Sequence, residues 1–342
     1  MEAKPKVLIL YTGGTIGMIK DANTDQLTNV NFEHIYDHVP ELRRLNIDLE
    51  TQSFDDPIDS SEMNIKHWQE IAKTIFENYS HYDGFVVLHG SDTMAYTASA
   101  LSFMFEGLQK PIILTGSQLP IGIIRTDGKE NLITAIEIAA ATGNNREAVI
   151  QEVAVYFEYK LFRGNRCSKD SADNFEAFRS PNFQDLAEAG VRINYNTHKL
   201  FRSSSAELKL DLDLNNRVAL LKLFPGMDFS VYKELFDRER IDGVLIESFG
   251  AGNTPTSPAF KGMLKGFIDD GGIVVNITQC NSGAVQQGLY KASSLFSEIG
   301  VLSGGDMTTE AAITKMMFAL NTANLSKANA LLSQNLRGEV SL

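Results

Sequence analysis

Three short segments place hydroxyl or carboxylate side chains directly after an apolar run. In the first, VLILYTGGTIGM (residues 7–18), Thr12 and Thr15 flank two glycines. A threonine hydroxyl can attack a carbonyl carbon if another group takes its proton. Glycine lets the backbone turn sharply and approach a ligand closely. The loop is therefore a candidate for a catalytic hydroxyl, with a structural turn and a phosphate site as alternatives. The chain has no G-x-x-x-x-G-K-[ST] motif, and TGGTIG lacks the G-x-G-x-x-G spacing, which weakens the phosphate interpretation.

The other two segments supply further polar groups. HGSDTM (89–94) contains Ser91 and Asp92, and TGSQ (115–118) contains Ser117. Serine and aspartate also cap helices well, and a helix is expected after HGSDTM, so capping is predicted to account for one of these groups. It does not obviously account for three polar side chains in four residues.

A hydroxyl nucleophile needs a general base, and the sequence offers few candidates. None of the six histidines stands in a known nucleophile signature. His34 and His38 lie four residues apart, but without the Glu of an H-E-x-x-H motif a solvated helix face is favoured over a metal site. Lys169, in RGNRCSKD (163–170), is the alternative, because a buried lysine can act as a base. Taken by itself, it is more typical of an ordinary surface lysine.

Seven apolar runs are predicted to be the strands that position these loops. They are residues 7–11, 85–89, 111–115, 153–157, 218–224, 244–248 and 273–278. Most are continuous β-branched runs, which are typical of parallel strands covered on both faces. Amphipathic segments at 67–79 and 259–272 are predicted helices. The alternation predicts an α/β fold, in which the carboxyl ends of the strands bring the three loops to one edge.

The chain has 342 residues, which exceeds the usual ~100–150 of one domain. We predict two α/β domains, each a largely parallel sheet flanked by helices. The catalytic domain is expected at 1–195 and a smaller C-terminal domain at 216–342. The polar residues 196–215, with their SSS cluster, are predicted to link them.

Composition excludes several classes of function. The formal net charge of −12 would repel phosphate backbones, so nucleic acid is not an expected partner. No stretch has the ~20 apolar residues of a membrane span, and MEAKPKVLILY is not typical of a signal peptide. Two distant cysteines predict neither a disulfide framework nor a zinc site. A reduced, cytoplasmic setting is expected.

Eight motifs, in order along nearly the whole chain, resemble those of the bacterial type I, cytoplasmic L-asparaginases. They are YTGGTIGM, DSSEM, YDGFVVLHGSDTMAYTASALSFM, TGSQLP, FRGNRCSKDSADNFEAFRSPN, GAGN, VVNITQC and SQNLRGE. The separation between the two glycine-bearing hydroxyl motifs makes the resemblance specific. It favours the catalytic interpretation of the first loop well above its alternatives.

The resemblance implies catalytic roles for five residues. Thr15 matches the nucleophile of the family, and Thr12 matches a supporting threonine at the start of its loop. Ser91 and Asp92 match a Thr-Asp pair, and Lys169 matches a buried lysine. In such enzymes the Thr, Asp and Lys form a hydrogen-bonded group that deprotonates the attacking hydroxyl or water.

Other residues are matched to substrate binding. Ser60 matches the residue that holds the α-carboxylate of the substrate, and Asp92 also matches the acceptor of its α-ammonium. Ser61 stands where many secreted relatives carry glutamine, and Ser117 is a further candidate contact. Asn253 of GAGN matches a residue that reaches the active site of a neighbouring subunit.

The reaction implied by the resemblance is hydrolysis of L-asparagine to L-aspartate and ammonia through an acyl-enzyme, without a metal or cofactor. Glutamine differs by one methylene, typically worth ~1–3 kcal/mol in a pocket, so weak glutamine activity is expected beside a preference for asparagine. A homodimer or a tetramer formed by two dimers is implied, with the site completed between subunits.

The chain departs from the family pattern at three places. Ser91 keeps the hydroxyl of the usual threonine but loses the methyl group that stiffens χ1. The expected lid, 19–30, has no tyrosine, so activation of Thr15 is predicted to depend on Lys169, Asp92 and Ser91. Glu247 stands where some relatives use an arginine to bind regulatory asparagine, and its charge predicts that this regulation is absent or differently built.

Two other functions are weighed against an asparaginase. One is the amidotransferase subunit that deamidates glutamine for a tRNA-bound glutamate. That protein has an extra N-terminal domain. In the present sequence the first strand is expected to begin at Val7, which leaves no room for such a domain. The other is a sensor that binds asparagine without turnover, although a sensor has no need of Thr15, Asp92 and Lys169 together.

Overall fold

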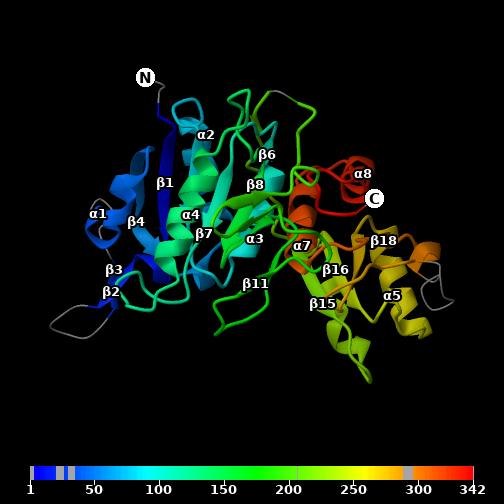
Figure 1. Cartoon of the computed structure of the whole chain (residues 1–342). Coiled ribbons are helices and arrows are strands. Elements are labelled where there is room, and N and C mark those ends of the chain that lie inside the picture. The colour runs from blue at the N-terminus through cyan, green and yellow to red at the C-terminus, as the bar shows by residue number, and fades with distance from the viewer. Residues whose placement is uncertain (1–3, 21–26, 30–34, 206, 288–295, 342) are drawn as a thin grey trace. The chain divides into compact units, whose positions relative to one another are not determined.

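The computed structural model describes residues 4–20, 27–29, 35–205, 207–287 and 296–341 (Figure 1). The chain divides into two compact units. The first comprises Met1–Ser180 and Gln184–Leu212, and the second comprises Pro181–Phe183 and Asp213–Leu342. Among the described helices, none combines the length and the apolar character that crossing a membrane requires.

Within its described residues, the first unit has an eight-stranded sheet with the order β13-β12-β9-β8-β7-β5-β1-β4. Its strands are β1 Lys6–Gly13, β4 Asp48–Ile58, β5 Gly84–Leu88, β7 Ile112–Thr115, β8 Val153–Phe157, β9 Lys160–Arg163, β12 Ala187–Ala189 and β13 Ile193–Tyr195. Neighbours from β4 to β8 are parallel, and those from β8 to β13 are antiparallel. The prediction of a largely parallel α/β sheet is confirmed.

The central strands are parallel because both of their faces are covered. Every residue of β5 and β7 is buried, as continuous apolar runs require. Helix α4 (Gly128–Ala140) packs on β5 and β7, α3 (Met94–Met104) packs on β8, and α2 (Ile65–Asn78) packs on α3. Helix α2 buries the four residues expected from its amphipathic pattern: Trp68, Ile71, Ala72 and Ile75.

The antiparallel half of this sheet was not predicted. Strands β8 and β9 are joined through Glu158 and Tyr159, which have φ values of +44° and +68°. Such left-handed conformations usually call for glycine or asparagine, so this turn has no sequence signal. The next strands, β12 and β13, have three residues each, which is too short for a clear period-two pattern.

Short elements complete the described part of the first unit. They are α1 Ile35–His38, the 3₁₀ turns η1 Thr15–Gly17, η3 Pro40–Arg44 and η4 Ser60–Glu62, and the paired strands β2 Met18–Lys20 with β3 Leu27–Asn29, β6 Phe105–Glu106 with β14 Lys209–Leu210, and β10 Ser168–Lys169 with β11 Phe178–Arg179. Strand β14 lies within the segment predicted as a linker and pairs with β6 of the first unit.

In the described part of the second unit, four parallel strands have the order β15-β16-β17-β18. These strands are β15 Val218–Lys222, β16 Gly243–Ser248, β17 Ile273–Thr278 and β18 Leu302–Ser303, and the other elements are η5 Phe229–Phe236, α5 Pro258–Asp269, α7 Thr309–Ala319 and α8 Leu325–Ser333. Leu245 of β16 packs with residues of α7 and α8. Its neighbours Val244 and Ile246 pack with residues of α5. Alternate side chains of one strand therefore enter two cores.

A buried ion pair fastens the C-terminal segment of the second unit to α7. Lys315 and Glu339 have no exposed side-chain area, and their charged atoms lie 2.6 Å apart. The ammonium also donates to the Leu332 carbonyl, and the carboxylate accepts from the backbone N–H groups of Leu336 and Arg337. Burial lowers the pKa of Lys315, while Glu339 opposes this shift. Loss of one partner would leave the other charge buried and uncompensated.

Lys315→Met is therefore expected to lower the free energy of unfolding by about 3–5 kcal/mol in urea titrations. Adding Glu339→Gln should recover part of this loss, because the second change removes the stranded charge. The matched control is Lys261→Met, which breaks the exposed pair with Glu298 and should cost about 0–1 kcal/mol. Equal effects of Lys315→Met and Lys261→Met would contradict the interpretation.

Candidate active site

Four adjacent parallel strands end in the loops that the sequence singled out. In spatial order, β4 leads to Ser60, β1 to Thr15, β5 to Ser91 and β7 to Ser117. Because all four strands are parallel, their carboxyl ends lie on the same edge of the sheet. This edge is where open α/β sheets bind ligands.

Three of these turns meet through glycine. Gly13 and Gly14 have φ values of +134° and +90°, which side chains rarely allow. A Cβ on Gly13 would lie 2.2 Å from the Ile58 carbonyl oxygen, and one on Gly14 would lie 2.5 Å from the Gly90 nitrogen. A Cβ on Gly90 would lie 2.5 Å from Ser60 Oγ. Close contact with backbone therefore requires Gly13 and Gly14, whereas Gly90 is in close contact with the Ser60 side chain.

The two threonines of the first loop have different surroundings. Thr12 is 1% exposed, and its hydroxyl donates to the Leu88 carbonyl at 2.9 Å, which joins the ends of β1 and β5. Thr15 begins the turn η1 directly after Gly14 and is partly exposed. The geometry gives Thr12 a supporting position and leaves Thr15 on the accessible side of the loop.

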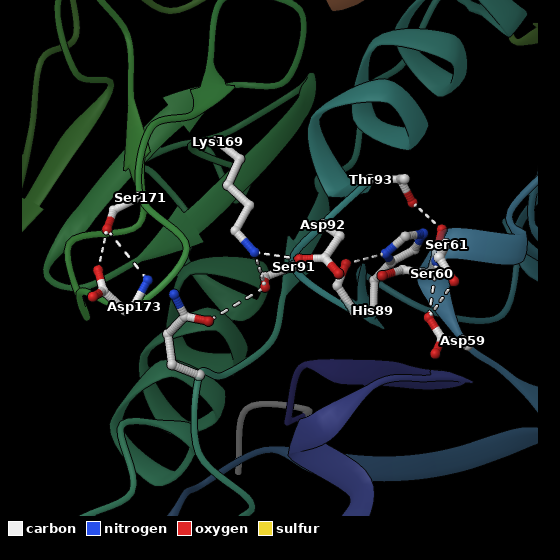
Figure 2. Close-up of polar contacts among 12 residues, drawn as sticks. Asp59, Ser60, Ser61, His89, Ser91, Asp92, Thr93, Lys169, Ser171 and Asp173 are labelled. Carbon is white, nitrogen blue, oxygen red and sulfur yellow. Dashed lines mark hydrogen bonds and ion pairs between the residues drawn. The ribbon is translucent and has the colours of Figure 1, made fainter.

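The structure brings Lys169 to Ser91 and Asp92, which are more than 75 residues away in sequence (Figure 2). The Lys169 ammonium donates to Ser91 Oγ at 2.9 Å and forms an ion pair with Asp92. The Lys169 side chain is 17% exposed, whereas the Asp92 side chain is 65% exposed. Ser91 Oγ also contacts Gln118 Oε1 at 3.5 Å. The lysine is thus shielded, while the carboxylate is open to a ligand.

The loop that carries Lys169 is anchored at several points. Lys169 belongs to β10, where it pairs with Phe178 of β11. At the start of the same loop, Arg163 forms a buried ion pair of 2.6 Å with Glu152. Arg166 in the middle of the loop is only 2% exposed. An ordinary surface lysine would not need such an anchored and buried support.

The Ser60 turn is tied to the Ser91 turn by Thr93, the third polar side chain of HGSDTM. Thr93 occupies the N-cap position of α3 but makes no capping bond. Its hydroxyl instead donates to the Ser60 carbonyl at 2.7 Å (Figure 2). The capping explanation is therefore wrong for Thr93. A side-chain bond between two turns has no local signal in HGSDTM.

The two serines after β4 have different environments. Ser60 is 5% exposed and lies against Gly90. Ser61 is exposed, and both its backbone N–H and its hydroxyl donate to Asp59 at 2.9 Å. These hydrogen bonds lower the pKa of Asp59. The Ser61 hydroxyl is thus engaged within its own turn.

Ser117 is 3% exposed, and its hydroxyl donates to the Leu119 carbonyl at 2.6 Å. The buried carboxylate of Asp127 accepts the backbone N–H groups of Gln118 and Leu119 at 2.9 and 3.1 Å. Local hydrogen bonds therefore hold the third loop together. The side chain of Gln118 extends from this loop to contact Ser91.

Asn253 lies in the second unit, in a turn with two glycines of positive φ, Gly250 and Gly252. Its backbone forms an isolated antiparallel bridge with Phe249, and its side chain is partly exposed. The Thr278 hydroxyl donates to the Gly250 carbonyl at 2.6 Å, which fixes the turn to β17.

Two further expectations concern the lid and Glu247. The expected lid, 19–30, includes residues of β2 and β3, while 21–26 and 30 lie outside the described residues. Glu247 is 7% exposed, accepts from the Thr309 hydroxyl at 2.6 Å and pairs with Lys222 at 3.2 Å. In the part of the chain that the structure covers, no group of His, Cys, Asp and Glu is arranged to hold a metal ion.

Comparisons with known proteins show the family to which the chain belongs. The family model "Asparaginase, N-terminal" matches residues 6–201, and the "Glutaminase/Asparaginase C-terminal domain" matches residues 217–330. L-asparaginase 1 of Escherichia coli K12 is 39% identical, with 98% of both chains covered. The crystal structure of L-asparaginase I from Vibrio cholerae is also 39% identical and aligns with a TM-score of 0.89 over 99% of this chain and 100% of that one. The thermostable L-asparaginase from Thermococcus kodakarensis gives a TM-score of 0.89 at 32% identity, over 98% of this chain and 99% of that one. The chain therefore belongs to the asparaginase family.

Proposed function

We propose that this protein is an L-asparaginase that hydrolyses L-asparagine to L-aspartate and ammonia, with Thr15 as the nucleophile. The observation that carries the proposal is the convergence of Lys169 on Ser91 and Asp92, beside the turn that presents Thr15. Membership of the asparaginase family supports the same amide hydrolysis.

In the first step, Thr15 Oγ1 attacks the side-chain amide carbon of asparagine. Its proton passes to the Ser91–Asp92–Lys169 group and then to the departing nitrogen, which leaves as ammonia. The product is an ester between Thr15 and the β-carboxyl group of aspartate. Backbone N–H groups of the tight turns stabilise the oxyanion of the tetrahedral intermediate.

In the second step, water attacks the ester carbonyl while the same group accepts a proton from the water. The bond to Thr15 breaks, the threonine hydroxyl regains its proton, and L-aspartate is released. No metal or cofactor takes part. The exposed carboxylate of Asp92 accepts the α-ammonium of the substrate, and Ser60 holds the α-carboxylate.

The finer features of the proposal follow from the family resemblance. Asparagine is preferred over glutamine, and the difference in transition-state binding free energy is about that of one methylene group. The enzyme is cytoplasmic and forms homodimers that can pair into tetramers. Asn253 of one subunit contributes to the active site of its partner, and the domains divide at residues 196–215. Ser61 and Ser117 support substrate binding through the turns that they shape.

Thr15→Val is expected to reduce ammonia release from asparagine by more than about a thousandfold, because valine has the shape of threonine but no nucleophile. Calorimetry should still detect binding of L-aspartate to the variant. Wild-type protein that binds asparagine without releasing ammonia would instead identify a sensor. Ammonia release from glutamine alone would favour an amidotransferase-type glutaminase.

Lys169→Met is expected to lower kcat by about 10²–10⁴-fold, the usual range for loss of a general acid–base group. The matched control is Lys160→Met, because Lys160 is 49% exposed and forms its ion pair with Asp185, away from Ser91 and Asp92. That control should keep wild-type kcat. Near-normal turnover by Lys169→Met would exclude the proposed proton transfer.

A mixing experiment tests the role of Asn253. Thr15→Val and Asn253→Ala homo-oligomers should each be inactive or strongly impaired in ammonia release. If the subunits are unfolded, mixed and refolded together, each hybrid dimer contains one intact composite site. Statistical mixing should then restore about a quarter of wild-type activity. Activity no higher than the sum of the two separate variants would show that the site is not shared.

A further inference from the structure

Three buried side chains are linked by hydrogen bonds in a series that ends at the backbone next to Ser91. His89 is fully buried, and its Nδ1 lies 2.7 Å from the Gly90 carbonyl oxygen. Its Nε2 lies 2.8 Å from the Thr97 hydroxyl, which also accepts the Trp68 indole N–H at 2.9 Å. Because Trp68 belongs to α2 and Thr97 to α3, these hydrogen bonds connect two helices to the turn that carries Ser91.

The donors and acceptors in this series determine the tautomer of the imidazole. The Trp68 indole N–H can only donate, so the Thr97 oxygen accepts it. The Gly90 carbonyl oxygen can only accept, so His89 Nδ1 carries the ring proton and donates it there. The Nε2 atom of the neutral ring then has no proton, and it accepts the hydroxyl hydrogen of Thr97. Burial lowers the pKa of His89 to about 4, so the ring is neutral at pH 7.

Gly90 is the residue through which three turns touch. Its nitrogen lies 2.5 Å from the place of a Cβ on Gly14, and a Cβ added to Gly90 would lie 2.5 Å from Ser60 Oγ. The carbonyl that His89 binds belongs to the peptide between Gly90 and Ser91. A rotation of this peptide would redirect the Ser91 side chain and disturb the contact with the Thr15 loop.

We infer that His89 is a positioning residue for the hydrolysis. Its Nδ1–H, held in place by Thr97 and Trp68, fixes the peptide before Ser91 and so aligns Ser91 and Asp92 with Thr15. This inference rests on the proposed function. His89 takes no part in proton transfer to the substrate, because both ring nitrogens are already occupied.

A merely structural role for the series predicts a different result from a positioning role. A structural bond would change stability and leave the turnover of folded enzyme intact. A positioning bond acts on the geometry of the reacting groups, so its loss lowers kcat more than it changes KM. A misplacement of about 1 Å can cost on the order of a hundredfold in rate.

The test compares three variants of α3 at a temperature where each is folded. Thr97→Val removes the hydroxyl while keeping the shape of the side chain, and Thr97→Ser keeps the hydroxyl. Ser102→Ala is the control, because Ser102 is also buried on α3 but donates only to the Ala98 carbonyl of its own helix. We expect kcat to fall by about 10–100-fold in Thr97→Val. We expect Thr97→Ser and Ser102→Ala to stay close to wild type.

The tautomer is measured separately, in wild-type protein labelled with ¹⁵N-histidine, with His89→Gln used to assign the signal. A protonated Nδ1 and a bare Nε2 support the inference, and a protonated Nε2 overturns it even if Thr97→Val fails to fold. Equal kcat in Thr97→Val and Ser102→Ala also overturns it. If wild-type protein releases no ammonia, the proposed function fails. The tautomer measurement then still tests whether His89 Nδ1 donates to the Gly90 carbonyl.

Discussion

The close approach of three turns at the edge of a parallel sheet is the constraint on which the site depends. Gly14 lies against Gly90, and Gly90 lies against Ser60, at separations that no side chain on either glycine would allow. Parallel pairing of β4, β1 and β5 brings the turns to the same edge, and glycine lets them touch. The turn that carries Thr15 thereby touches the turn that carries Ser91.

Most polar side chains around this edge are used to hold backbone rather than to meet a ligand. Thr12 binds the end of β5, Thr93 binds the Ser60 turn, and Asp127 binds the turn after β7. Each such bond satisfies a backbone group where water is largely excluded. A buried histidine, His89, does the same for the peptide before Ser91. The side chains that we propose to react are therefore carried by turns that several hydrogen bonds hold in place.

The ion pairs of the protein differ in what their burial means. Arg163 and Glu152 are buried together and anchor the loop that leads to Lys169. In the pair between Lys169 and Asp92, the lysine is shielded and the carboxylate is exposed, which agrees with the proposal that Asp92 binds the substrate. Glu247 already forms an ion pair with Lys222. Among the contacts of the described residues, no cation is left there to bind the carboxylate of a regulatory ligand.

The sequence by itself determined the strand and helix types, because continuous β-branched runs and amphipathic segments are local patterns. It also identified the chemical groups, and the resemblance in its motifs predicted the family that the comparisons confirmed. Only the tertiary structure decided which groups meet: Lys169 with Ser91, Thr93 with Ser60, and the hydrogen-bonded series that ends at His89. The antiparallel half of the first sheet was equally hidden from the sequence. The physical reason is that such contacts depend on the order and register of strands far apart in the chain, whereas local patterns report only which face of an element is buried.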